Sequence, residues 1–323
     1  MIQPFFRVRS LRSLALIVLL GCNGQGGEGG DGAGDLPPAE RAERPSFDAQ
    51  RAHEHLRRQV AFGPRIPGTA GHARQLEWMR GYLAERADTV VEQPFTHTTT
   101  GGETLRMTNL FARFRPELQD RVLLVAHWDT RPRADESSNP ADRERPVPGA
   151  NDGASGVAVL LELAEMFRQR PPPVGVDLLL VDGEDYGPTG EDMYLGARHF
   201  AANLPAGYRP FYGIVVDMVG DRNPRFPVES NSQQYAPEVV QRVWSLAREM
   251  GYGDIFVASE GGAIEDDHIP LNRAGIRTID IIDFEYGPGN RYWHTLQDVP
   301  ENTSAESLRI VGEVLAELVY RGG

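Results

Sequence analysis

The sequence predicts an α/β fold with one central sheet, and two observations support this. Three mostly apolar runs, at residues 121–127, 176–181 and 212–218, have polar residues at or next to their carboxyl ends. Such runs are typical of strands that are buried on both faces of a parallel sheet. Stretches with helical spacing of apolar residues separate these runs. Strands that alternate with helices indicate a parallel sheet with helices packed against it.

Six helices are expected where apolar residues recur at helical spacing. The second helix carries Leu76, Met79 and Leu83 on one face. The third is followed by three prolines, residues 171–173, which cannot continue a helix. The helices are predicted, in chain order, at residues 47–58, 70–86, 154–168, 194–203, 236–250 and 304–320.

Three further strands complete the expected sheet. Two of them flank Gly101-Gly102, a turn signal, and the third precedes the C-terminal helix. We find no internal repeat and no linker between Arg58 and Arg321, so the elements are expected to form a single domain. The strands are predicted, in chain order, at residues 89–98, 104–114, 121–127, 176–181, 212–218 and 278–282.

The N-terminus has the features of an export signal. Arginines precede an apolar run, residues 14–20, that is too short to span a bilayer. The run leads into Leu-Leu-Gly and Cys22, the only cysteine of the chain, which resembles the lipobox of bacterial lipoprotein signals. We expect a signal peptide at 1–22, lipidation of Cys22, and export to the bacterial cell envelope with a lipid anchor. The alternative is an ordinary secretory signal with an incidental thiol. The Gly- and acid-rich residues 23–45 are expected to form a flexible tether before the single domain at 46–323.

Composition excludes several classes of function. The formal net charge is −13, so a nucleic-acid-binding surface is not expected. The chain contains no lysine, which excludes Schiff-base catalysis by a lysine and the phosphate-binding P-loop. The membrane is expected to be a partner only through the lipid anchor.

Polar side chains that can bind a metal follow the predicted strands. The carboxyl ends of parallel strands meet at one edge of an α/β sheet, where sites are built. Two adjacent acids at such an edge need a positive charge near them, so we expect one to bind a metal ion and the other to act as a base. Imidazole and carboxylate ligands together suit zinc. These residues are His127, Asp152, Glu184, Asp185, Asp217 and His294.

Each residue also has a simpler interpretation when it is taken alone. Asp152 could be the N-cap of the helix that begins beside it. His127 could be a hydrogen-bonded histidine at a strand end, and Asp217 could accept hydrogen bonds from loop amides. Their coincidence at several strand ends favours a metal site.

These residues belong to segments that resemble the zinc aminopeptidase and glutaminyl cyclase superfamily. The match runs in order from about Arg65 to the C-terminus. It implies a mixed, mostly parallel central sheet sandwiched between helices, and peptide or protein N-termini as substrates. The matching segments are His127-Trp128-Asp129, residues 149–156, Asp182-Gly183-Glu184-Asp185, Asp217 and Trp293-His294-Thr295.

The resemblance implies one of two chemistries. In the cyclases, one zinc ion lies at the positions that match Asp152, Asp185 and His294. Glu184 then moves a proton from the α-amine of an N-terminal glutamine to the departing ammonia, and pyroglutamate forms. In the aminopeptidases, two zinc ions share Asp152, and the second-metal ligands match His127 and Asp217. Glu184 is then the general base that activates water.

Two positions favour a zinc-dependent glutaminyl-peptide cyclotransferase. Asp266 begins a segment that resembles a cyclase motif whose aspartate shares a proton network with Glu184 and Asp217. Trp293 matches the cyclase tryptophan that walls the substrate pocket. The alternative interpretations are that Asp266 caps a loop and that Trp293 packs against the edge of the domain.

Departures from the animal cyclases leave the substrate open. Those enzymes have a glutamate in place of Asp185, a tryptophan where this chain has Tyr186-Gly187-Pro188, and a disulfide that cannot form here. A metallo-aminopeptidase is therefore the second interpretation, because all five possible ligands are present. A catalytically silent binding module on the same fold is a remote third.

Overall fold

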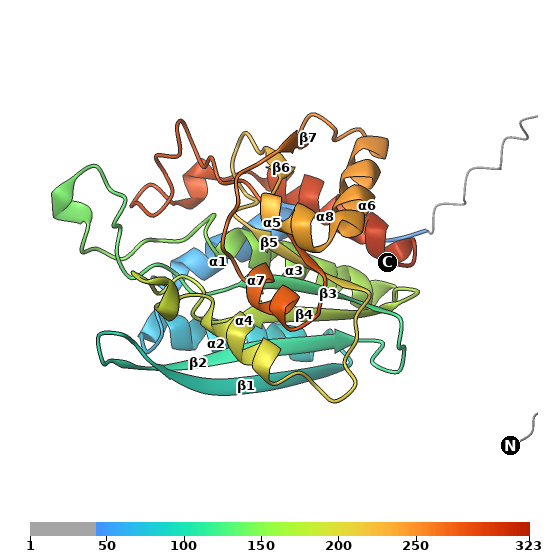
Figure 1. The fold of residues 1–323 in the computed structure, drawn as a ribbon, viewed down its shortest axis with the longest axis horizontal. Coiled ribbons are helices and arrows are strands. Elements are labelled where there is room, and N and C mark those ends of the chain that lie inside the picture. Colours follow the sequence, from blue (N-terminus) through green and yellow to red (C-terminus); the bar gives the residue numbers. More distant parts are fainter. Residues whose placement is uncertain (1–42) are drawn as a thin grey trace, which may run out of the picture. The chain divides into compact units, whose positions relative to one another are not determined.

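The central sheet has six strands in the order β1-β2-β4-β3-β5-β8 (Figure 1). The computed structural model describes residues 43–323, so the predicted signal peptide, Cys22 and most of the predicted tether lie outside the described residues. Strands β4, β3, β5 and β8 are parallel, while β1 and β2 form an antiparallel hairpin that joins β4. The strands are β1 (Thr89–Thr98), β2 (Thr104–Phe114), β3 (Arg121–His127), β4 (Gly175–Val181), β5 (Tyr212–Asp217), β6 (Phe226–Val228), β7 (Phe256–Glu260) and β8 (Thr278–Ile282).

Helices cover both faces of this sheet. In Figure 1, α4 and α7 lie in front of the sheet, and α1, α3 and α8 lie behind it. None of the helices among residues 43–323 is long and apolar enough to cross a membrane. The α-helices are α1 (Ala49–Ala61), α2 (Ala70–Ala84), α3 (Ala154–Gln169), α4 (Leu195–Ala202), α5 (Ser230–Tyr235), α6 (Pro237–Glu249), α7 (His268–Arg273) and α8 (Ala305–Tyr320), and the short 3-10 helices are η1 (Pro140–Asp142), η2 (Gly190–Asp192) and η3 (Pro300–Asn302).

Alternate residues of each central strand pack into two hydrophobic cores. On β3, Leu124 belongs to the larger core beneath α1, α3 and α8, whereas Leu123 and Val125 belong to the smaller core beneath α4 and α7. All seven residues of β3 are buried, as the continuous apolar run predicted. The α/β fold with a mixed, mostly parallel sheet between helices is confirmed.

The structure also adds elements that the sequence did not predict. Strands β6 and β7 form a separate parallel pair, and α5 and α7 lie in segments for which no helix was predicted. The folded chain also begins before residue 46. Arg44, at the end of the predicted tether, donates from Nε to Glu317 Oε2 on α8 at 2.9 Å.

Candidate active site

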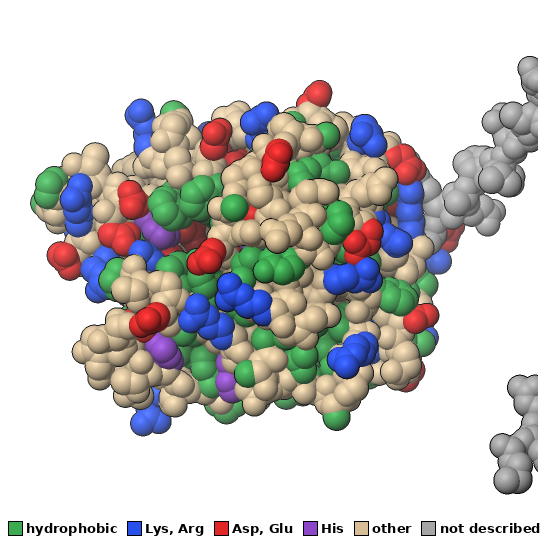
Figure 2. Space-filling view, viewed as in Figure 1, with side chains coloured by type: hydrophobic (Ala, Val, Ile, Leu, Met, Phe, Trp, Pro, Cys, Tyr) green, Lys and Arg blue, Asp and Glu red, His purple; other side chains and the backbone are tan. Residues whose placement is uncertain are grey.

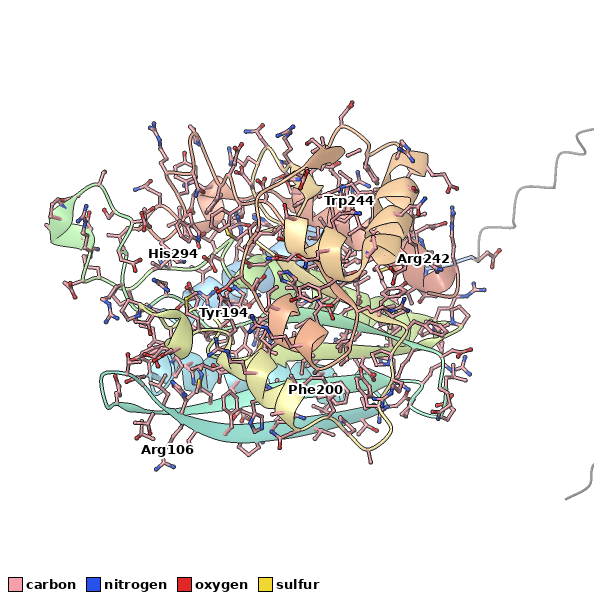
Figure 3. The ribbon with its side chains drawn as sticks, in the orientation of Figure 1. Arg106, Tyr194, Phe200, Arg242, Trp244 and His294 are labelled. Atoms are coloured by element: carbon pink, nitrogen blue, oxygen red, sulfur yellow. The ribbon has the colours of Figure 1, made fainter. Side chains whose placement is uncertain are left out.

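Four parallel strands bring the predicted site residues to one edge of the sheet. His127 ends β3, Glu184 and Asp185 follow β4, and Asp217 ends β5. The fourth strand, β8, contributes through the loop that carries His294, one of the residues labelled in Figure 3. The sixth residue, Asp152, belongs to the long connection between β3 and α3 and lies directly before the helix.

Asp152, Asp185 and His294 form one possible metal site. All three are buried, and one ligand atom from each lies within 4.8 Å of the others. His294 Nε2 is 3.2 Å from Asp185 Oδ1 and 3.5 Å from Asp152 Oδ2. Asp185 Oδ2 is buried without a hydrogen-bond partner among the described residues. Two carboxylates, one imidazole and an unpartnered buried oxygen fit zinc.

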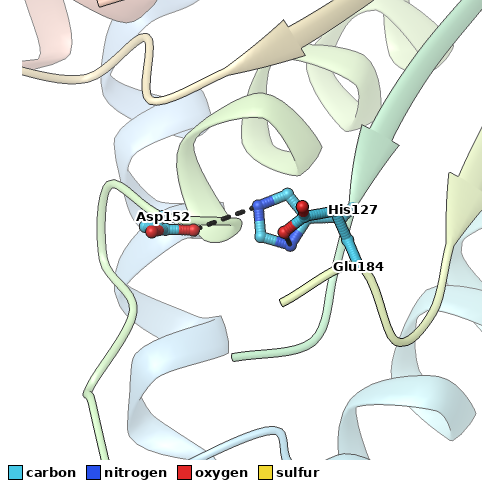
Figure 4. Close-up of side chains that lie close together, drawn as sticks. All are labelled: His127, Asp152 and Glu184. Atoms are coloured by element: carbon cyan, nitrogen blue, oxygen red, sulfur yellow. Dashed lines mark ion pairs between the residues drawn. The ribbon is translucent and has the colours of Figure 1, made fainter. Parts of the chain in front are cut away.

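A second possible site surrounds His127. Its Nε2 is 3.2 Å from Asp152 Oδ1 and 3.1 Å from Asp217 Oδ1. Figure 4 shows His127 at the end of its strand, between Asp152 and Glu184. The second-metal residues named from the sequence are therefore brought together with the first set, and Asp152 lies between the two histidines.

Asp152 does not cap the helix beside it. The N-cap of α3 is Gly153, and no side chain caps this terminus. A Cβ at Gly153 would lie 2.7 Å from His127 Cε1, so only glycine allows α3 to begin this close to the histidine. The N-cap interpretation of Asp152 is therefore wrong, and its carboxylate faces the two histidines.

Asp129 fixes the positions of Glu184 and Asp185. Its carboxylate accepts hydrogen bonds from the backbone N–H groups of Glu184 at 3.0 Å and Asp185 at 3.1 Å. Asp129 Oδ1 also lies 3.5 Å from His127 Nδ1, whereas Asp152 is close to the other ring nitrogen, Nε2. The carboxylate thus supports the acidic pair and directs His127 Nε2 toward the site.

Asp135 and Asp298 support the other two ligands. Asp298 accepts hydrogen bonds from the backbone N–H groups of Asn151 at 2.7 Å and Asp152 at 3.2 Å. Asp135 Oδ1 lies 3.5 Å from His294 Nδ1, which leaves Nε2 facing the site. Asp129 stood in a segment that the sequence singled out, but no sequence signal marks Asp135 or Asp298.

The polar loop at 131–148 contributes to the site through Arg131. This guanidinium donates to Asp185 Oδ1 at 3.0 Å and to Asp135 Oδ2 at 2.7 Å. Among residues 43–323, Arg131 is the only arginine or lysine that lines the cavity beside these carboxylates, and it compensates part of their charge.

Burial raises the pKa of two further carboxyl groups of the site, Glu184 and Asp217. It raises the pKa of Glu184 well above its ordinary value, and the charges of Asp185 and Asp266 add to this effect. Burial likewise raises the pKa of Asp217 to about 7. Glu184 and Asp217 line the same cavity, and their raised pKa values favour a proton on one of the two carboxyl groups near neutral pH.

His294 carries a proton in this anionic environment. Although burial lowers its pKa, the charge of Asp185 and contacts with Asp135 and Asp152 raise it to about 11. A metal ion at Nε2 would displace this proton.

Trp293 encloses the site on the side of His294. The two rings stack with centroids 3.9 Å apart, and Phe284 is tilted against Trp293 at 4.9 Å. These residues line a cavity of about 330 Å³, which also contains Asp266. Trp293 packs on a possible ligand rather than only on the domain edge.

Three residues of this cavity have a left-handed backbone that side chains other than glycine rarely adopt. Their φ angles are +59° at Tyr194, +49° at Met218 and +51° at His294. Such strain is commonly stored at functional sites. Tyr194, also labelled in Figure 3, was not predicted as a site residue; its backbone N–H donates to the Glu184 carbonyl oxygen at 2.8 Å.

Asp266 lies in the cavity, as expected, and it also accepts a local hydrogen bond. The Asp267 backbone N–H donates to Asp266 Oδ1, whereas Oδ2 has no hydrogen-bond partner among the described residues. Loop capping therefore accounts for Oδ1 of Asp266 but not for Oδ2.

Comparison with known proteins shows similarity to both enzyme types. The model of peptidase family M28 matches residues 109–319. Among curated proteins, the glutaminyl-peptide cyclotransferase of Bos taurus is 24% identical over 296 residues, which cover 79% of this chain and 77% of that protein.

Two solved bacterial structures have the same fold. The glutaminyl cyclase of Tannerella forsythia is 40% identical with a TM-score of 0.82, and the match covers 85% of this chain and 99% of that one. A Zn-dependent exopeptidase from Parabacteroides distasonis is 38% identical with a TM-score of 0.83, covering 86% and 99% of the two chains.

Proposed function

This chain belongs to peptidase family M28, and from that premise we propose that it is a zinc-dependent glutaminyl-peptide cyclotransferase. The observation that carries the proposal is the cavity of about 330 Å³, in which Trp293 covers His294 beside Glu184. A space of this size accepts one side chain. The similarity to glutaminyl cyclases from Bos taurus and Tannerella forsythia supports the same assignment.

Asp152, Asp185 and His294 would hold the zinc ion of the cyclase. When bound, zinc would polarise the carbonyl of the glutamine side-chain amide. Three further carboxylates keep these ligands in place. Asp129 accepts a hydrogen bond from the Asp185 backbone N–H, and Asp298 accepts one from the Asp152 backbone N–H. Asp135 lies close to His294 Nδ1.

Glu184 would carry the proton that the reaction must move. The α-amine nitrogen of the substrate forms a bond to the side-chain amide carbon, and the bond from that carbon to its NH₂ group breaks. Glu184 takes a proton from the attacking amine and gives it to the departing nitrogen, which leaves as ammonia. Its raised pKa means that Glu184 holds a proton more readily than an ordinary carboxyl group does, which suits a group that must carry one.

The proposed cyclisation would also use Asp217, Asp266 and Trp293. The carboxyl groups of Asp217 and Asp266 would hold the α-amine and set the charge around Glu184, since all three line one cavity. Trp293 would exclude water from the glutamine side chain, which favours ring closure over hydrolysis.

A metallo-aminopeptidase is the second candidate, and the intact environment of His127 favours it. His127 Nε2 lies as close to Asp152 and Asp217 as His294 Nε2 lies to its own partners. A two-ion enzyme would use both sets, with Glu184 as the base that activates water.

One incubation distinguishes the candidates. Purified protein is given a peptide with N-terminal glutamine, and the product is measured by mass spectrometry while zinc per chain is counted. Loss of ammonia from an otherwise intact peptide, with one zinc ion, supports the cyclase. Release of free glutamine with two zinc ions would replace it with the aminopeptidase. Neither product, with no stoichiometric zinc, would favour a binding module.

We further propose that the protein is exported and lipid-anchored through Cys22. The support is the sequence alone, since residues 1–42 lie outside the described part. Replacing Cys22 with serine should release the protein from the membrane fraction of an expressing bacterium. Equal membrane retention of both forms would contradict the anchor.

A further inference from the structure

A second cavity of about 380 Å³ adjoins the catalytic one. The two cavities share Ala263, Ile264, Ile282 and Phe284 as lining residues. Pro227, Ile264 and Phe284 give the second cavity an apolar surface, and the Phe284 side chain is 37% exposed. A peptide whose first residue occupies the catalytic cavity therefore has an apolar path for the residues that follow.

The segment 261–264 lines the second cavity and is held in place. Its Gly261 N–H donates to the Val228 carbonyl at 2.7 Å. The Ile264 N–H donates to Glu229 Oε1 at 2.9 Å, and Asn231 Nδ2 donates to the Ile264 carbonyl at 2.8 Å. These bonds fix the segment to β6 and α5, so the second cavity is preformed.

Carboxylates dominate the charge of this second cavity. Glu260 and Glu285 are exposed at its edge, while Arg225 is the one basic residue that lines it. The buried Glu229 adds negative charge, because its hydrogen bonds outweigh burial and lower its pKa to about 2. Figure 2 shows acidic side chains exposed over the region of β6 and β7.

We propose that this cavity binds the second and third residues of the peptide substrate and selects an apolar residue followed by a lysine or arginine. The inference rests on the proposed cyclase activity and names its substrate class. Two extended residues span about 7 Å, and the two cavities share four lining residues, so the chain that follows the first residue enters the second cavity. Apolar contact with Phe284 and Pro227 accounts for the second position, and the charge of Glu260 and Glu285 for the third.

The test compares glutamine amide, Gln-Leu-Arg amide and Gln-Leu-Glu amide as substrates of the zinc-loaded full chain. At low ionic strength, kcat/KM for the Arg peptide should exceed that for the Glu peptide about five-fold, a ratio typical of exposed charge pairs. The ratio should fall toward one in 1 M salt. The double variant Glu260→Gln/Glu285→Gln should abolish the ratio and leave glutamine amide turnover unchanged. The matched control Glu54→Gln/Glu301→Gln removes two exposed charges on α1 and η3 and should keep the ratio.

The outcomes distinguish a failure of the proposed subsite from a failure of the proposed cyclase activity. Equal rates for the two peptides, or a ratio that survives in the Glu260/Glu285 variant, would overturn the subsite while the cyclase stands. No turnover of any of the three substrates would overturn the proposed function, and the subsite with it.

Discussion

Replacing Asp129 with asparagine should weaken both the fold and the metal site. The carboxylate accepts two backbone hydrogen bonds, at 3.0 and 3.1 Å, from Glu184 and Asp185. Asparagine keeps one acceptor and turns an NH₂ group toward the second buried N–H. The loss of one charged hydrogen bond and the unsatisfied donor together cost about 3 kcal/mol. Because Asp129 also holds the backbone of Asp185, a proposed zinc ligand, zinc affinity should fall about 10- to 100-fold.

Two measurements check this prediction. Urea unfolding of the zinc-free protein gives the change in unfolding free energy, and competition with a zinc chelator gives the change in affinity. Asp120→Asn, at an exposed aspartate before β3, is the control and should behave like wild type. Wild-type stability and affinity in Asp129→Asn would refute the supporting role, because the backbone bond that asparagine cannot accept would then be dispensable.

Three further predictions follow from the structure. Glu184→Gln should keep zinc but lower kcat about 10²- to 10⁴-fold, because an amide cannot carry a proton; a wild-type rate would remove Glu184 from the mechanism. His294→Ala should lose zinc, as measured by metal analysis after dialysis, and full metal retention would show that the ligand set is misassigned. Burial, with the charges of Arg51 and Arg86, lowers the pKa of His55 to about 4, against about 6.5 in the unfolded chain. The unfolded state alone then binds the proton between these values, so stability should fall by about 3 kcal/mol as pH drops from 6.5 to 4. His55→Phe should flatten this part of the stability profile, and an unchanged slope would assign it to another group.

The sequence predicted the central sheet closely because burial leaves a direct pattern. Strands β1, β2, β3 and β8 have the expected bounds, and β5 ends one residue earlier, at Asp217. The short pair β6 and β7 was missed because β6 has three residues with a proline, and most of β7 is exposed. Helices α5 and α7 have six residues each, and such short helices depend on tertiary contacts rather than on their own periodicity.

The residues of the site likewise divide into those that the sequence pattern predicts and those that only tertiary contacts bring together. Residues at strand ends were predictable, because the sheet brings those ends together. Asp135 and Asp298 could not be predicted, since each meets its partner across more than 140 residues of chain. Arg131 likewise reaches Asp185 across 54 residues.

The position of Asp152 between two histidines has an evolutionary consequence. Each of its oxygens faces a different imidazole, Oδ1 toward His127 and Oδ2 toward His294. The same carboxylate can therefore serve a site that holds two ions and a site that holds one. A lineage that moved between the two would keep it, and the change of reaction would fall on the residues that enclose the cavity, Trp293 and Phe284 among them. Hydrolysis and cyclisation would then be separated by few mutational steps on one unchanged framework.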